Sequence, residues 1–444
     1  MKITKMSLVA ALLIGSSAFA IENTKVTGDV NVYYMTQDKA NSGLATSDGG
    51  LFEAANSAAD IGLNLNLTTD LYKADALSIS AGVGYTVLTT LGLENNLVGN
   101  VWGGAHTADA ATGSYYGHPV NGAKVNNAAW VNEAWIAISA AKTTIKVGRM
   151  ELDTPLAFTE KWSIEKNTFE AAVVINQDIP NTTLVGAFVG NGNGTETFGQ
   201  NAQSIVQGVN LAVAPVVNGN GDFTTYGSDG AYAIAVINNS WKPLTVQAWY
   251  YDVTRIATAS WLQADLNMDG ILAGIQYSTL DISTTKNQLG TIGDKTNVNV
   301  SSSATAVMLG YAMKDVMTVK ASYSVIGKDH SAGQNTATDF IGGTAQSKLY
   351  TEAWWNYGQV TKAGAKAINL TVEAPTSVAD LGLYFTNVTQ NANETDLTEL
   401  TVTASKSLGP VDATLAYIYT NLGDGNAATN DSLNALQVYL TVNF

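Results

Sequence analysis

The chain ends in LQVYLTVNF, residues 436–444, in which every second residue is apolar. The apolar set is Leu436, Val438, Leu440, Val442 and Phe444, and the intervening set is Gln437, Tyr439, Thr441 and Asn443. Successive side chains of a β-strand point to opposite faces of a sheet. This stretch therefore predicts a strand with one apolar face and one polar face.

The same alternation recurs along the whole chain. IGLNLNLT at residues 61–68 and LSISAGVGYTV at residues 77–87 are two further examples. We expect about eighteen strands of this kind, at roughly 26–35, 60–69, 76–88, 128–139, 143–149, 167–176, 182–190, 230–239, 243–252, 259–266, 270–281, 304–313, 316–326, 364–373, 378–388, 396–406, 411–420 and 433–444. The polar faces carry hydroxyl, amide and glycine residues rather than charges, and no amphipathic helix is evident beside them.

The connections between these strands alternate in length. Short ones such as 140–142 and 314–315 alternate with long ones rich in Gly, Asn, Ser, Asp and Thr. Short turns on one edge and long loops on the other are typical of a bacterial transmembrane barrel. The sequence therefore predicts an all-β transmembrane antiparallel barrel with short periplasmic turns and long extracellular loops. The external loops should include 89–127, 191–229 and 328–363.

The N-terminus predicts export. Lys2 and Lys5 precede an apolar run from Met6 to Ile14, and the small residues after it end in Ala18-Phe19-Ala20. This is the pattern of a cleaved signal peptide. We therefore expect residues 1–20 to be removed and residues 21–444 to form a single barrel domain in the bacterial outer membrane.

Composition excludes several functions. The chain has 37 acidic against 22 basic residues, only 13% charged residues and no cysteine. An acidic chain lacks the basic face that binding to nucleic acid requires. The absence of cysteine excludes disulfides and thiolate chemistry. No nucleophile elbow is present, and we expect the protein not to be an enzyme.

Several stretches resemble one known family. VNEAWIAISAAKTTIKVGRMELDTPLAF at 131–158 is similar to a segment of the major outer-membrane porins of Campylobacter-type bacteria, within the OprD-like porin superfamily. TFEA at 168–171, QDIPNTTLVGAFVG at 177–190, QAWYYD at 247–252 and EAWWNY at 352–357 extend the likeness. The resemblance implies a trimeric eighteen-stranded barrel that conducts ions and small nutrients across a lipopolysaccharide-containing bilayer. Phe444 resembles the terminal aromatic residue by which the outer-membrane assembly machinery recognises barrels.

The third long loop of such porins commonly folds inward, which places a pore constriction at about 150–166. The candidate constriction residues are Lys146, Arg149, Glu151, Asp153, Glu160 and Lys161. By strand parity Arg149 would face lipid, so its inclusion requires a bulge at Gly148. By the same parity, aromatic residues of the lipid-facing side include Tyr34, Trp130, Tyr250 and Phe444.

Strand parity also selects charges on the barrel wall. The other lumen-facing candidates are Asp29, Glu133, Lys320, Asp380 and Glu399. Carboxylates outnumber the single ammonium group, which predicts a weak preference for cations in a passive diffusion channel for ions and small hydrophilic solutes. Two alternatives stay open: a substrate-selective channel for small organic acids or peptides, and a surface adhesin or structural barrel.

One short motif suggests a metal. Asp265, Asn267, Asp269 and Gly270 have the spacing that opens a calcium loop, but the twelfth position holds Gln276 instead of glutamate. Asn-Met-Asp-Gly is also a sequence that a tight turn favours. We expect a turn here and no cofactor, with structural calcium left open and other metal sites unknown.

Overall fold

The computed structural model describes residues 22–38, 50–52, 57–89, 100–101, 128–161, 164–193, 223–225, 230–254, 257–282, 300–338, 345–390, 396–422 and 432–444. The predicted signal peptide at 1–20 and most of the predicted external loops 89–127 and 191–229 lie outside these residues. No helix among the described residues is long and apolar enough to cross a membrane.

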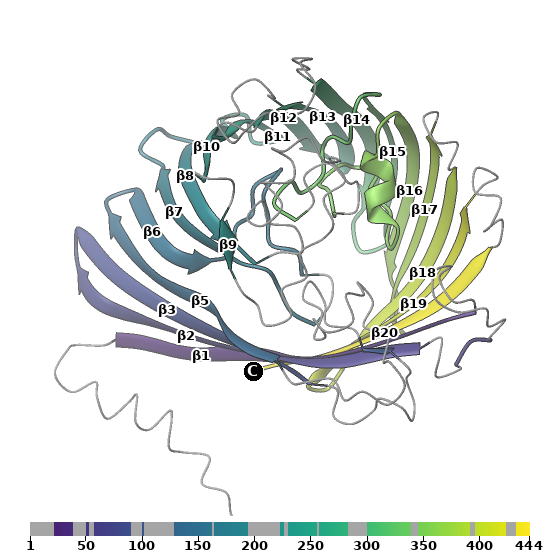
Figure 1. The fold of residues 1–444 in the computed structure, drawn as a ribbon, viewed down its shortest axis with the longest axis horizontal. Coiled ribbons are helices and arrows are strands. Elements are labelled where there is room, and N and C mark those ends of the chain that lie inside the picture. Colours follow the sequence, from purple (N-terminus) through teal and green to yellow (C-terminus); the bar gives the residue numbers. More distant parts are fainter. Residues whose placement is uncertain are drawn as a thin grey trace, which may run out of the picture.

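Eighteen antiparallel strands form a closed barrel (Figure 1). They are β1 (Glu22–Gln37), β2 (Ser57–Ala74), β3 (Leu77–Thr89), β5 (Ala128–Ala140), β6 (Thr143–Met150), β7 (Phe169–Asn176), β8 (Thr182–Gly192), β10 (Ala231–Asn238), β11 (Leu244–Val253), β12 (Ala257–Met268), β13 (Ile271–Ile282), β14 (Val300–Met313), β15 (Met317–Ile326), β16 (Ala365–Pro375), β17 (Asp380–Gln390), β18 (Leu397–Leu408), β19 (Val411–Leu422) and β20 (Leu433–Asn443). Two short strands, β4 (Asn100–Val101) and β9 (Thr224–Thr225), pair with β2 and β8. The predicted strands agree with these in number and place.

The barrel closes where the two ends of the chain meet. β1 pairs with β20 in register from Asp29 with Asn443 to Gln37 with Ala435. Beyond that register, the backbones of Gly28 and Phe444 exchange both hydrogen bonds at 2.9 Å. The Phe444 ring lies over Gly28, where an added Cβ would come within 2.6 Å of the ring. The terminal aromatic residue therefore covers a glycine at the closing seam.

Because side chains alternate between the two faces of each strand, apolar residues lie on the outside of the barrel wall and small or polar residues lie on the inside. On β14, Val307, Leu309 and Tyr311 face outward, and the Leu309 side chain is 69% exposed. Ala304 and Ala306, on the opposite face of the same strand, are buried inside the barrel. An outer band of large apolar residues is the lipid-facing surface of a transmembrane barrel.

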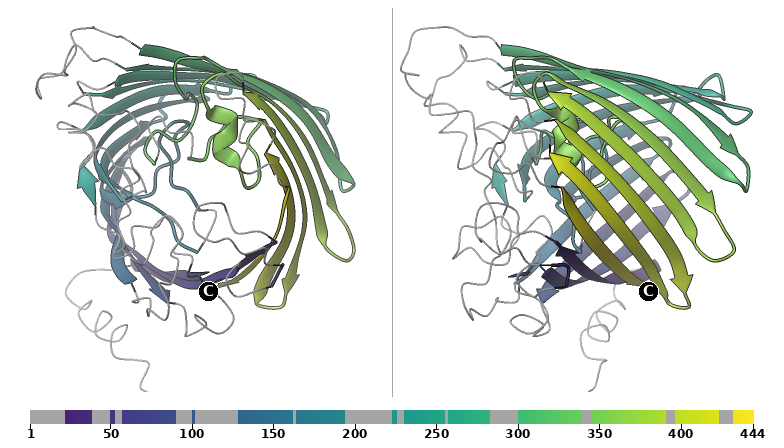
Figure 2. Two further views of the ribbon diagram at one scale, coloured as in Figure 1. Left: turned by 45° about the vertical axis from the view of Figure 1, so that its right-hand side comes forward. Right: turned by 90° about the vertical axis from the view of Figure 1, so that its right-hand side faces the viewer.

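Short turns join the strands at one edge of the barrel (Figure 2). The β12–β13 turn consists of Asp269 and Gly270, whose φ angles are +52° and +86°. Positive φ at both central residues is the geometry of the tightest hairpin turn, which Asp-Gly favours. The motif that resembled the start of a calcium loop is a hairpin turn.

Two long connections fold into the barrel instead of standing away from it (Figures 1 and 2). The first inner segment is the β6–β7 connection, described at 151–161 and 164–168. The second inner segment is the β15–β16 connection, described at 327–338 and 345–364, and it contains a 3-10 helix, Tyr357–Thr361. We expected an inward fold only of the first inner segment. The loop 328–363 begins at the edge of the barrel that carries the long connections, but its described residues fold into the lumen, which was not predicted. Its polar composition gave no sign of the contacts that hold it inside.

The hydrophobic core lies between these segments and the barrel wall. Leu152, Leu156 and Leu349 of the inner segments are buried in one cluster with Phe169 and Trp261 of the wall. Several other inward wall positions in this cluster are alanines: Ala233, Ala259, Ala304, Ala306 and Ala367. Small side chains leave the room that a chain segment inside a barrel needs.

A bulge in β5 changes the parity of its side chains. In the pairing of β3 with β5 the register shifts, and Asn132 is the extra residue. Glu133 and Trp130 both point inward as a result, and Trp130 packs with Ile164 in a second buried cluster. The expectation that Trp130 faces lipid is wrong, because strict alternation does not survive an inserted residue.

Candidate functional site in the barrel lumen

The first inner segment is held to the wall by amide and hydroxyl side chains. Asn64 Nδ2 donates to the Ile164 carbonyl at 3.3 Å, and Thr168 Oγ1 donates to the Asn132 carbonyl at 2.6 Å. Gly62 lies directly under this segment, since a Cβ at Gly62 would come within 2.2 Å of the Ile164 carbonyl oxygen. The polar face of the β2–β5 wall is therefore a binding surface for the segment.

The second inner segment has an equally specific attachment. The Gln276 side chain donates to the Lys348 carbonyl at 2.7 Å and accepts from the Tyr350 backbone N–H at 3.1 Å. Farther along, Glu399 accepts from the backbone N–H groups of Trp355 and Asn356 at 3.0 and 2.8 Å. A buried carboxylate that accepts several N–H groups fixes the backbone strongly.

The two inner segments also bind each other inside the barrel. The Leu156 carbonyl accepts from the Thr336 backbone N–H at 2.9 Å. Glu160 accepts from Thr338 Oγ1 at 2.6 Å and from Asn335 Nδ2 at 2.9 Å. These contacts join the segments into one bridge inside the barrel.

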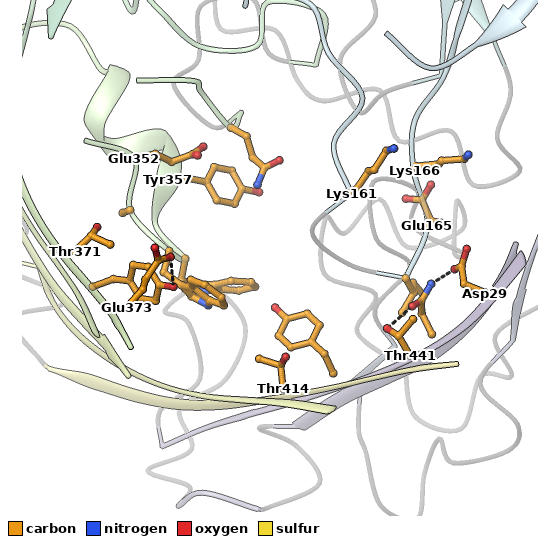
Figure 3. Close-up of a pocket in the computed structure, with 18 of the residues that line it drawn as sticks. Asp29, Lys161, Glu165, Lys166, Glu352, Tyr357, Thr371, Glu373, Thr414 and Thr441 are labelled. Atoms are coloured by element: carbon orange, nitrogen blue, oxygen red, sulfur yellow. Dashed lines mark hydrogen bonds between the residues drawn. The ribbon is translucent and has the colours of Figure 1, made fainter. Parts of the chain in front are cut away.

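A cavity of about 820 Å³ lies between this bridge and the wall of β15–β17, β19, β20, β1 and β2. Five carboxylates and three ammonium groups line it: Asp29, Glu151, Glu165, Glu352, Glu373, Lys161, Lys166 and Lys320. Figure 3 shows Lys161, Lys166 and Asp29 on one side and Glu352, Tyr357 and Glu373 on the other. The lining is thus net acidic and differs between its two sides.

The lysines of the first side are held in ion pairs. Lys166 Nζ lies 2.6 Å from Glu133 and also pairs with Glu151, which pairs with Lys161 in turn. Burial alone would raise the pKa of Glu151, but Lys166 and Lys161 outweigh it and hold that pKa below its usual range. Burial opposes the charge of Lys166, yet Glu151 and Glu133 outweigh it and raise the pKa of the ammonium group. Glu151 and Lys166 are therefore both charged at neutral pH.

The other side is aromatic. Six aromatic residues line the cavity: Tyr350, Trp354, Trp355, Tyr357, Tyr384 and Tyr439. The Trp354 and Tyr384 rings have centroids 5.0 Å apart, and Tyr384 Oη donates to Glu373 at 3.1 Å. Lys320 Nζ lies 3.8 Å from the other Glu373 oxygen. We call Trp354, Trp355, Tyr357, Tyr384 and Glu373 the aromatic bank.

A second cavity, of about 490 Å³, lies beside the β10–β13 wall. Gln247, Trp249 and Gln263 line it, together with Asp153 and Lys348 of the two inner segments. Asp153 pairs with Lys348, so this ion pair is a further link in the bridge. No group of three or more potential metal ligands occurs within the described part of the chain.

The structure brings several predicted site residues together. Asp29, Glu151, Lys161 and Lys320 line the large cavity, and Asp153 lines the smaller one. Glu133 is linked to Glu151 through Lys166, which forms an ion pair with each of them.

Two other predicted residues, Lys146 and Asp380, line neither cavity, although Lys146 is near enough to Glu133, Glu151 and Lys166 to interact with their charges. Lys146 Nζ lies 4.0 Å from the centre of the Trp135 ring and does not line the large cavity. Asp380 is exposed at the start of β17, beside the β16–β17 turn.

Three predicted residues, Glu160, Glu399 and Arg149, have other roles. Glu160 is 6% exposed and Glu399 is 1% exposed, because each carboxylate is enclosed by backbone and side-chain donors of the second inner segment. Both carboxylates point into the barrel, but each is bound by the second inner segment and is thereby buried from a permeating solute. The sequence predicted that both residues lie on parts of the chain that face the lumen. It did not predict that the second inner segment covers them.

Arg149 does not join the constriction either. Gly148 has a φ of +126°, yet both ladders of β6 run through it without a register shift. Arg149 therefore keeps its outward parity, opposite Glu170. Its Nε donates to Glu170 at 2.7 Å and its Nη1 donates to the Val131 carbonyl at 3.0 Å, so an outward guanidinium is tolerated without a bulge.

The aromatic residues of the bank and Glu352 were not among the predicted site residues. EAWWNY at 352–357 contributes most of them. Two adjacent tryptophans beside a glutamate, in a loop with no apolar period, are unusual enough to suggest a function. Only the inward path of the second segment, however, could assign them to the lumen.

No family model matches the sequence, and no curated protein matches it. Solved structures do match the fold. OccK1 of Pseudomonas aeruginosa has a TM-score of 0.68 at 11% identity, covering 95% of this chain and 99% of that one. OccK9 of the same bacterium (0.68, 13%, 95% and 99%) and OccAB1 of Acinetobacter baumannii (0.68, 11%, 95% and 97%) are similar. The chain therefore has the fold of the OprD/Occ outer-membrane porins, which confirms the OprD-like resemblance at the level of fold.

Proposed function

We propose that this protein is a passive diffusion channel of a bacterial outer membrane, with a weak preference for cations, of the Campylobacter-type porin line that its sequence resembles. The observation that carries the proposal is the large cavity inside a closed barrel, whose lining has more carboxylates than ammonium groups. A water-filled constriction lined by charges is what a porin uses to select.

The ion pairs of the lysines support a preference for cations over anions. Lys166 and Lys161 are each bound to carboxylates, whereas Asp29 accepts hydrogen bonds from the amides of Asn31 and Asn64. A fixed charge at partly reduced dielectric acts on a nearby ion by on the order of 1 kcal/mol or more. A net acidic lining therefore concentrates cations.

A channel for organic acids is the alternative that the neighbours raise, because one of them, OpdK of Pseudomonas aeruginosa, was crystallised with vanillate. An anion path needs lysines or arginines that are available to a carboxylate. In this cavity Lys161, Lys166 and Lys320 each have a carboxylate of the protein beside them. This pairing favours the cation-preferring channel.

We further propose that the barrel assembles as a trimer among lipopolysaccharide, after export by the predicted signal peptide. The outer band of exposed apolar residues fits a lipid-facing surface. Blue native electrophoresis of the detergent-extracted protein, with cross-linking, should give three protomers. A single protomer in mild detergent would count against the trimer and leave the channel proposal unaffected.

Single-channel recording tests the channel itself. Purified, heat-modifiable barrel in a planar bilayer should give stepwise conductance in potassium chloride, and liposomes containing it should swell in small sugars. A folded barrel that inserts without conductance would overturn the proposal and favour a plugged, structural barrel.

A further inference from the structure

We propose that the aromatic bank is a binding site for organic cations, meaning solutes with an ammonium group attached to an apolar or aromatic body. This inference rests on the proposed channel function and specifies a solute class for it. Inorganic cations need only the acidic lining, whereas the aromatic bank offers a surface that a hydrated metal ion does not use.

Several aromatic rings line the same cavity. Trp354 and Tyr384 are in ring contact, with an interplanar angle of 34°, and both are only partly buried. Trp355, Tyr357 and Tyr439 line the same cavity and are partly buried as well. Ring faces carry negative potential, and a cation above such a face is stabilised by about 0.5–2 kcal/mol, depending on its hydration.

A carboxylate completes the site. The Glu373 side chain is 47% exposed and lies beside the Tyr384 hydroxyl, which donates to it. Its nearest ammonium group, Lys320 Nζ, is 3.8 Å away, which is longer than a hydrogen bond. Glu373 therefore keeps capacity to accept from a further N–H donor or to face a quaternary ammonium group.

The wall is shaped to hold the ring in place. A Cβ added at Gly382 would come within 2.6 Å of the Tyr384 ring and 2.8 Å of its hydroxyl oxygen. Glycine at this position lets the ring lie flat against β17, with its hydroxyl directed to Glu373. Tyr384 of β17 and Glu373 of β16 thus place an aromatic ring and a carboxylate side by side on neighbouring strands.

The opposite side of the cavity explains why an anion is the poorer ligand. Its ammonium groups are neutralised by Glu133 and Glu151, and the Tyr384 hydroxyl is already a donor to Glu373. An aromatic carboxylate would bring a second negative charge beside Glu373, and Lys320, the ammonium group nearest to the bank, already lies next to that carboxylate. An aromatic ammonium ion satisfies both features of the bank.

Block of the potassium current tests the site. Benzyltrimethylammonium should reduce the single-channel current in a concentration-dependent way, at about fivefold lower concentration than tetramethylammonium, which lacks a ring to pack against the aromatic bank. Benzoate should not block in the same range. Equal block by both ammonium ions, or stronger block by benzoate, would overturn the proposal.

Two variants locate the effect. Trp354→Leu and Glu373→Gln should each raise the half-blocking concentration of benzyltrimethylammonium about fivefold. The matched controls are Tyr250→Leu on the outer face and Asp178→Asn at a turn, both exposed and far from the cavity lining. Heat modifiability and unblocked conductance show that each variant is folded.

The outcomes separate the two proposals. Loss of block in both site variants and not in the controls supports the site. Unchanged block in both site variants contradicts it, even though the channel stands. Absence of any conductance in the unmodified protein would contradict the channel function itself.

Discussion

At Gly62 and Gly274 the barrel wall has no side chain, and the inner segments occupy the space. The Ile164 carbonyl oxygen lies 2.2 Å from where a Cβ of Gly62 would be, and the Tyr350 hydroxyl lies 2.3 Å from that of Gly274. Real Cβ atoms do not approach other atoms so closely, so any larger residue would force a segment to move. Single glycines thus define how near to the wall each segment lies.

We expect Gly62→Val to displace the first inner segment toward the cavity that Ile164 lines. The narrowed path should lower single-channel conductance, while the barrel still folds. Gly186→Val is the matched control, because nothing lies within 4 Å of a Cβ at that position. If both variants conducted like the unmodified protein, the segment could not be part of the constriction.

Glu151 is the residue whose loss should change selectivity most. Glu151→Gln removes the carboxylate that Lys161 and Lys166 share, whereas Lys166 keeps its ion pair with Glu133. The lining becomes more positive, so the reversal potential under a salt gradient should shift toward anion preference. Asp178→Asn, at an exposed turn, should leave it unchanged. A shift of the same size in both would refute the role of Glu151.

At the scale of elements, the strands were predictable and the inner segments were not. The alternation of apolar and polar residues along β14 or β20 can be read from the local sequence. Every strand has it because one of its faces contacts lipid. The second inner segment has no such period. Its position depends on single contacts with distant wall residues such as Gln276 and Glu399, which no local pattern specifies. The register shift at Asn132 was missed for the same reason.

Glu399 should be the main fastening of the second inner segment. Trp355 N–H donates to one Glu399 oxygen and Asn356 N–H to the other, so Glu399→Gln places an NH₂ group opposite one of these two donors. Leaving such buried donors unsatisfied costs about 1–3 kcal/mol. Amide hydrogen exchange of residues 352–361 should therefore accelerate, with the barrel strands unaffected. Thr389→Val, a change on β17 outside the contacts of Glu399, is the control; unaltered exchange in both would contradict this role.

The closing seam leads to a prediction about assembly. Deleting Phe444 removes both backbone hydrogen bonds with Gly28 and the ring that covers it. We expect less heat-modifiable barrel in the outer membrane and more degradation in the periplasm. Phe444→Tyr, which keeps the ring and the backbone, should assemble normally. Full assembly of the truncated chain would show that the terminal residue is dispensable.

For the whole molecule, the cation preference of the lumen should change with pH in one range and stay constant below it. Burial raises the pKa of Glu352 to about 8, so this carboxylate gains a proton as the pH falls through that value. Glu151, whose pKa is depressed, stays charged well below the range in which an ordinary carboxylate is protonated. Cation preference should therefore decrease between about pH 9 and pH 7 and then stay constant into mildly acid solution. Glu352→Gln should abolish the upper step, and its persistence would assign the step to another group.

The central claim is that a bridge of two inner segments leaves a conducting, net acidic passage through a closed barrel. The reversal potential of the unmodified protein, measured in a planar bilayer under a tenfold gradient of potassium chloride, tests it most directly. We predict stepwise conductance and a reversal potential displaced from zero toward the potassium equilibrium potential. A reversal potential displaced toward the chloride equilibrium potential would contradict the account.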